Sequence, residues 1–184
     1  MLSINGITKA FGENLVLDEF SFEFPEKGLF LLRGKSGVGK TTLLRIIAGL
    51  EKPDRGSICR KGVLSMVFQE ARLLPFSTLW ENVLIVKRER DEKRAEALLK
   101  QFGLWEARAL FPDALSGGMR LRGAIVRSLY YGGDIFLWDE PTKELDPENR
   151  ALVRGAIEAL AREKLVIVVT HDPDLKGGTE IELK

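Results

Sequence analysis

The chain has 184 residues, of which 45% are hydrophobic and 30% are charged, and its formal net charge is +1. This composition is that of a soluble globular protein with one main core, and it excludes a global field that would hold nucleic acid or an anionic membrane. No apolar run approaches the length of a membrane span, the N-terminal residues lack the pattern of a signal peptide, and the single cysteine, Cys59, cannot form an internal disulfide. We therefore expect a cytoplasmic protein.

The first seventy residues are predicted to form short strands around one helix. The strand Leu15 to Phe24 alternates, with phenylalanines on one face and polar residues on the other. The helix is expected to end at Gly49, since glycine commonly follows the last helical residue. Strands are predicted over residues 2–8, 15–24, 28–32, 56–60 and 63–68.

A glycine-rich string, Gly34-Lys-Ser-Gly-Val-Gly-Lys-Thr41, separates the strand at 28–32 from that helix. Strand, glycine loop and helix form the context that a phosphate-binding loop requires. Glycines let successive backbone N–H groups surround an anion, and the helix start adds its own free N–H groups and dipole. Lys40 is expected to meet the outer phosphates and Thr41 to hold Mg²⁺. The predicted nucleotide contacts here are Gly34, Lys35, Ser36, Gly37, Val38, Gly39, Lys40, Thr41 and Thr42.

The middle of the chain has a different texture. Helices are predicted over 81–88 and 91–102, and the charge-dense stretch 87–94 mixes both signs, which favours a solvated helix surface over a nucleic-acid patch. We predict a single domain with a small helical subdomain at 71–115 inserted into an α/β core made of 1–70 and 116–184.

Alternating elements follow from Ser116 onward. The predicted order is a helix to about Tyr131, a strand at 134–138, a helix at 147–163 and a strand at 165–170. The strands are fully apolar, which is typical of a mostly parallel sheet covered on both faces. The fold class is therefore predicted to be α/β, preceded by an antiparallel β unit.

Polar residues follow two of these apolar strands. Asp139 and Glu140 come directly after Ile135–Trp138, and His171, the only histidine, follows the strand that ends at Thr170. The carboxyl ends of parallel strands would place all three beside the phosphate loop. Asp139 would then organise Mg²⁺, Glu140 would act as a general base toward water, and His171 would meet the γ-phosphate.

A second potential anion site lies at Leu115-Ser-Gly-Gly-Met119. Ser116 is a good N-cap, while Gly117 and Gly118 let a backbone approach the start of the next helix. Standing alone, a Ser-Gly-Gly string is a common turn.

Taken together, these strings resemble the ABC-type ATPase family over nearly the whole chain. In family terms, Gly34–Thr41 is the Walker A loop, Ile135–Glu140 the Walker B strand, and Leu115–Met119 the signature sequence. Gln69 matches the Q-loop, where it would help hold Mg²⁺ and take part in catalysis, Leu145-Asp146 the D-loop, and His171 the switch histidine. Phe11 stands where the family places an aromatic that stacks on adenine. Taken singly, Gln69 is also compatible with an ordinary strand-end residue and Phe11 with a hairpin core residue.

The resemblance implies a three-layer P-loop NTPase core, ATP and Mg²⁺ as cofactors, and a second cassette as partner. In this family two cassettes bind head to tail, so that the signature motif of one chain, here Ser116, Gly117 and Gly118, closes the ATP site of the other. A homodimer of this kind has a two-fold, self-complementary interface.

Several strings resemble bacterial importer cassettes of the nitrate, sulfonate and taurine type, among them Gln69–Pro75 and Phe111–Ser116. That resemblance implies ATP hydrolysis that powers transport through a separate transmembrane permease, at the inner face of the cell membrane, without contact between the solute and this chain. Because few residues follow His171, we expect no appended regulatory domain. The helical subdomain is shorter than in most members, and Leu121, Lys143 and Glu144 depart from the family pattern. These departures leave the chemistry intact and bear on partner docking.

Two other functions remain open at this stage. A soluble ABC ATPase acting on nucleic acid or the ribosome would usually carry long inserts or a duplicated cassette, which the sequence lacks. A nucleotide-gated module that does not hydrolyse ATP would have no use for Glu140 and His171. The sequence does not identify the solute, the direction of transport, or whether the partner cassette is identical.

Overall fold

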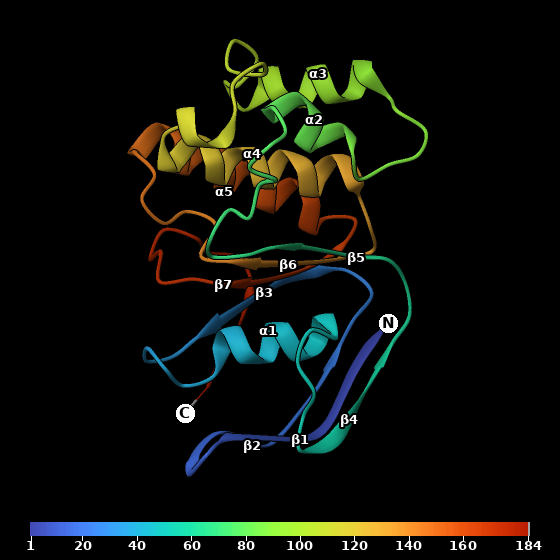
Figure 1. The fold of residues 1–184 in the computed structure, drawn as a ribbon. Coiled ribbons are helices and arrows are strands. Elements are labelled where there is room, and N and C mark those ends of the chain that lie inside the picture. The colour runs from blue at the N-terminus through green and yellow to red at the C-terminus, as the bar shows by residue number, and fades with distance from the viewer. Residues whose placement is uncertain (184) are drawn as a thin grey trace.

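The computed structural model describes residues 1–183, which form two β-sheets with helices between and above them (Figure 1). One sheet is antiparallel with the strand order β2-β1-β4, and the other is parallel with the order β5-β6-β7-β3-β8. The strands are β1 Leu2–Phe11, β2 Asn14–Phe24, β3 Gly28–Arg33, β4 Arg55–Arg60, β5 Leu64–Val67, β6 Ile135–Asp139, β7 Leu165–Val169 and β8 Thr179–Glu182. The helices are α1 Lys40–Ala48, α2 Leu79–Leu84, α3 Glu92–Gln101, the short 3₁₀ turn η1 Pro112–Ala114, α4 Gly117–Tyr131 and α5 Pro147–Ala161.

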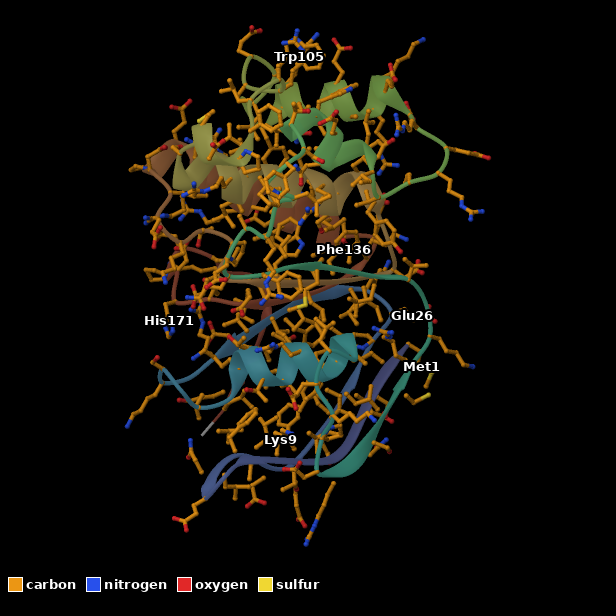
Figure 2. The ribbon with its side chains drawn as sticks, in the orientation of Figure 1. Met1, Lys9, Glu26, Trp105, Phe136 and His171 are labelled. Atoms are coloured by element: carbon orange, nitrogen blue, oxygen red, sulfur yellow. The ribbon has the colours of Figure 1, made fainter. Side chains whose placement is uncertain are left out.

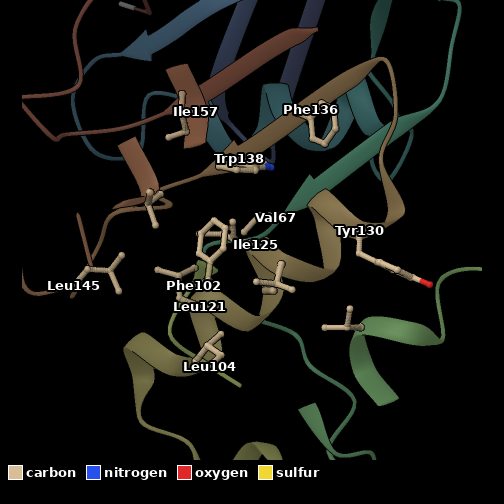
Figure 3. Close-up of a cluster of buried hydrophobic side chains, with 14 of the residues drawn as sticks. Val67, Phe102, Leu104, Leu121, Ile125, Tyr130, Phe136, Trp138, Leu145 and Ile157 are labelled. Atoms are coloured by element: carbon tan, nitrogen blue, oxygen red, sulfur yellow. The ribbon is translucent and has the colours of Figure 1, made fainter. Parts of the chain in front are cut away.

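The layers explain why the parallel strands are apolar on both faces. Figure 1 shows α1 between the two sheets, while α4 and α5 cover the opposite face of the parallel sheet and α2 and α3 lie beyond α4. Phe136 and Trp138 of β6 belong to the buried cluster under α4 and α5, of which Ile125 is also a member (Figure 3). Ile135 and Leu137 point to the other cluster, around α1. The α/β class with a mostly parallel sheet and an antiparallel β unit is therefore confirmed.

Two local features differ from the sequence prediction. Helix α2 begins at Leu79, earlier than predicted, because Thr78 and Glu81 form a capping box that sets its first turn, and it ends at Leu84. Strand β8 was not predicted, since its four residues are mostly exposed and polar, and its pairing with β3 comes from backbone hydrogen bonds. The predicted alternation of β2 is present, with Phe24 buried and Ser21 and Glu23 exposed.

Within residues 1–183, no helix combines the length and the apolarity that crossing a bilayer demands. The segment predicted as a helical subdomain, 71–115, holds α2, α3 and η1, and its helices pack on α4 of the following segment.

Candidate functional site

The phosphate loop lies at the carboxyl end of β3 and opens directly into α1. Gly39 has a φ of 100°, and a Cβ at this position would lie 2.5 Å from the carbonyl oxygen of Val16, so only glycine fits. Gly39 is also the N-cap of α1, and no side chain caps the helix start. The first N–H groups of α1 are therefore open to an anion.

Lys40 is 7% exposed and its ammonium donates to the backbone carbonyl oxygens of Gly34 and Lys35, both at 2.8 Å. These two bonds hold the lysine against the loop. An ammonium has three donors, so one remains for a phosphate oxygen.

Thr41 and Asp139 meet across the loop. The Thr41 hydroxyl donates to Oδ2 of Asp139 at 2.8 Å, whereas Oδ1 of Asp139 is buried and has no hydrogen-bond partner among the described residues. Burial raises the pKa of Asp139, and the Thr41 hydrogen bond and the charges of Lys40 and Lys143 act in the opposite direction. A buried carboxylate with an unused oxygen is costly unless a cation completes it.

These residues fit a magnesium ion. No cluster of three or more His, Cys, Asp or Glu that could hold a metal occurs in residues 1–183. Mg²⁺ seldom uses such an all-protein cage, because it keeps waters and takes one or two carboxylates together with substrate phosphates. One orphaned carboxylate oxygen beside one hydroxyl is the donor set that this binding mode requires.

Glu140 follows Asp139 with a φ of 51°, in a conformation that few non-glycine residues adopt. Its side chain is 14% exposed, and burial raises its pKa, while the backbone N–H and the charge of His171 lower it. The backbone N–H of His171 donates to Oε2 at 3.3 Å, and the ring Nε2 lies 3.5 Å from Oε1. Residue 171 therefore orients the carboxylate from two sides.

One cavity of about 400 Å³ gathers most of these groups. Figure 2 places His171 at the edge of the molecule where the parallel strands end, while Glu26 lies on the opposite side. Gln69, exposed after β5, reaches the same cavity. The lining residues are Ser36, Gly37, Gly39, Lys40, Thr41, Thr42, Gln69, Asp139, Glu140, Lys143, Val169 and His171.

Other predicted contacts lie outside this cavity. Gly34, Lys35 and Val38 belong to the loop but do not line the cavity. Phe11 ends β1 and is 50% exposed, so it is no core residue, and the ammonium of Lys9 lies 5.1 Å from the centre of its ring.

The signature residues lie away from the cavity of their own chain. Ser116 caps α4 by accepting a hydrogen bond from the Met119 N–H at 3.2 Å, and Gly117 and Gly118 form its first turn. Gly117 lines a second cavity of about 450 Å³.

Two lining residues, Lys143 and Val169, were missed as site residues, and only Lys143 carries a charge. In the sequence Lys143 stood out only as a departure that bears on partner docking, yet it lines both cavities. Its place three residues after Glu140 in a short turn is the signal that could have identified it.

The chain is similar in sequence to known proteins. The profile of the ABC transporter family matches residues 17–143. The chain is 36% identical over 179 residues to an aliphatic sulfonates import ATP-binding protein SsuB of Burkholderia ambifaria, covering 93% of this chain and 56% of the relative. It is 41% identical over 177 residues to SsuB 3 of Paraburkholderia xenovorans, covering 94% and 71%. The chain thus spans between about half and three quarters of the length of these relatives.

Solved structures are similar over the whole chain. The dimeric ATP-binding cassette MJ0796, in a post-hydrolysis state with ADP and Pi, superposes with a TM-score of 0.90 at 30% identity, covering 100% of this chain and 94% of the other. Another dimeric structure of the same cassette gives a TM-score of 0.89.

Proposed function

Because the chain belongs to the ABC transporter family, we propose that it is the ATP-binding and ATP-hydrolysing subunit of an importer, with Mg²⁺ and ATP bound at the cavity after β3. The observation that carries the proposal is the meeting of Lys40, Thr41, Asp139 and Glu140 in one cavity at the strand ends. The relatives are named as import ATP-binding proteins, and the net charge of +1 offers no field for nucleic acid, so both observations argue against the nucleic-acid alternative.

The residues divide the reaction between them. The loop N–H groups and Lys40 hold the phosphates, while Thr41, Asp139 and Gln69 hold Mg²⁺, which would neutralise phosphate charge when bound. Glu140 takes a proton from a water molecule while the oxygen of that water forms a bond to the γ-phosphorus. The bond between the γ-phosphorus and the bridging oxygen of the β-phosphate breaks, which releases ADP and phosphate. Its buried setting and raised pKa make Glu140 a stronger base than an exposed carboxylate.

The replacement Glu140→Gln tests this function. It removes the base and keeps the shape, so we expect steady-state phosphate release to fall by about 100-fold or more. Binding of a fluorescent ATP analogue should persist, and ATP-bound dimers should accumulate in size-exclusion chromatography. Glu26→Gln, far from the cavity, is the matched control (Figure 2). Unchanged turnover in Glu140→Gln would contradict the assignment.

The second part of the proposal is that the chain binds a transmembrane permease. Through this permease it would lie peripherally on the cytoplasmic face of a membrane. An apolar groove of about 460 Å³ lies between the end of α1, β5 and α4, and Leu50, at 54% exposed, is one of its rim residues. Exposed apolar surface of this kind fits an apolar cytoplasmic segment of an integral membrane protein. Import through such a permease is consistent with the names of the relatives.

Leu50→Asp tests the docking. We expect the variant to bind ATP normally but to lose co-sedimentation with vesicles that contain the permease, because a carboxylate would be buried against apolar surface. Leu110→Asp is the control, since Leu110 is 41% exposed and lies outside the groove. Equal vesicle binding by both variants would place the docking surface elsewhere.

A further inference from the structure

The turn that follows β6 holds the backbone of Lys143 firmly at the edge of the nucleotide cavity. The Lys143 N–H donates to the Glu140 carbonyl oxygen at 3.1 Å, and the Leu145 N–H donates to the Thr142 carbonyl oxygen at 3.4 Å. Thr142 is 4% exposed and Leu145 is 5% exposed, so the turn is anchored in the protein on both sides of Lys143. The Lys143 side chain itself is exposed to solvent.

That side chain is a cation without a partner. Within the part of the chain that the structure describes, the Lys143 ammonium makes neither an ion pair nor a hydrogen bond. The other lysine of the cavity, Lys40, already donates to two loop carbonyl oxygens. Lys143 therefore brings three unused donors to a cavity that must accept a highly charged anion.

Its neighbours place it at the reacting end. Lys143 lines the cavity together with Asp139 and Gln69, proposed for the metal, Glu140, proposed for water, and His171, expected at the γ-phosphate. Two carboxylates here would repel a terminal phosphate, and a lysine on a flexible stem can offset that charge by direct contact.

We propose that Lys143 is a second phosphate-binding lysine, which contacts the terminal phosphate of ATP from the turn after β6 while Lys40 contacts it from the loop. The inference rests on the proposed function and deepens it. Lys143 discriminates ATP from ADP, because only ATP has a phosphate at that end of the cavity. This role is specific to a chain with lysine in this turn.

Nucleotide binding to Lys143→Met tests the inference. We expect affinity for ATPγS to fall by about tenfold or more, as for the loss of one hydrogen bond to a charged group, while affinity for ADP stays unchanged. Lys143→Arg should keep most of the discrimination, since it keeps the charge. Lys27→Met, at an exposed turn position, is the matched control. Binding is measured by calorimetry on protein kept monomeric, with light scattering and thermal melting as checks of assembly and folding.

The outcomes separate the two proposals. Equal affinities of Lys143→Met and wild type for ATPγS would overturn the inference and leave the proposed function standing. Equal losses for ATPγS and ADP would overturn it as well, because the contact would not be specific to the terminal phosphate. A defect confined to dimer formation would assign Lys143 to the interface instead. A wild-type protein that bound neither nucleotide would refute the proposed function and this inference together.

Discussion

Ser128 joins two buried polar side chains in an otherwise apolar layer. Its hydroxyl accepts a hydrogen bond from the indole Nε1–H of Trp138 at 3.2 Å and shares one with the Ser65 hydroxyl at 2.8 Å. Trp138 is fully buried next to the strand-end carboxylate of Asp139, and its N–H needs an acceptor there. The serine pair supplies one, which explains how a tryptophan is accommodated directly before Asp139.

Ser128→Ala should therefore destabilise the protein. The indole N–H would remain buried without an acceptor, which costs about 1–3 kcal/mol of unfolding free energy. Urea unfolding followed by tryptophan fluorescence measures the loss. Ser57→Ala, at an exposed position in β4, is the control and should change stability little. A Ser128→Ala variant as stable as the Ser57→Ala variant would show that this bond contributes nothing.

At the scale of elements, the parallel sheet gathers the site by ending four strands at one edge. The loop follows β3, Gln69 comes shortly after β5, Asp139 ends β6 and His171 comes shortly after β7. At the opposite end of the strands, where they begin, Asp134 directly precedes β6. Its carboxylate accepts from the Val63 N–H at 3.0 Å and from the Lys164 ammonium at 3.1 Å, and so links the starts of three neighbouring strands.

Asp134 carries a pH dependence whose sign is defined. The Val63 N–H, followed by Lys164, lowers the pKa of Asp134 below its ordinary value of 3.8. The folded state therefore binds a proton less readily than the unfolded state, so this stabilisation is present above pH 3.8 and is lost as the pH falls through the folded pKa.

Asp134→Asn should lower the melting temperature at pH 7 by a few degrees, and the difference from wild type should begin to shrink near pH 3.8 and go on shrinking as the pH falls toward the lowered pKa of Asp134. Melting curves between pH 7 and pH 3 test this expectation. Asp18→Asn, at an exposed position in β2, is the control. A deficit that stayed constant over the whole pH range would assign the effect to packing and not to charge.

At the scale of the whole molecule, the phosphate loop and the signature residues of one chain do not share a cavity. Ser116 and Gly118 line neither the nucleotide cavity nor the one beside it, and Gly117 lines only the second. Both solved structures of the similar cassette MJ0796 are dimeric. The proposed head-to-tail homodimer would unite the two halves, with one chain's loop facing the other chain's signature.

Mixing two inactive variants tests this geometry. Lys40→Met removes the loop cation and Ser116→Arg blocks the signature, so each variant alone should be inactive. In a mixed head-to-tail dimer, one of the two sites combines an intact loop with an intact signature. Because half of the dimers in an equal mixture are mixed, activity should recover to about a quarter of wild type.

The recovery is measured as phosphate release, and Lys40→Met mixed with Glu140→Gln is the control. Both of these changes lie on the loop-bearing side, so no intact site can form in that mixture. Absence of recovery with Ser116→Arg, despite dimers in light scattering, would contradict the head-to-tail arrangement.

The fold class and the loop could be predicted from sequence because their signals are contiguous. The loop is predicted by glycines at fixed spacing together with Lys40 and Thr41, all within eight residues. The apolar strands predict a parallel sheet that is covered on both faces. Strand β8 could not be predicted in this way. Its four residues include two exposed glutamates and show no hydrophobic pattern, and they form a strand only by backbone hydrogen bonds to β3.

The sequence by itself determined that this chain carries a phosphate loop, two strand-end carboxylates and a separate serine-glycine helix start. Only the tertiary structure decided which side chains meet. In the fold, Thr41 donates to Asp139, and the backbone N–H of His171 orients the Glu140 carboxylate. The Ser128 hydroxyl accepts from the Trp138 indole, and Lys143 lies at the cavity wall. The physical reason is that such contacts join residues on separate strands and turns, so they exist only once the strands have assembled into the sheet.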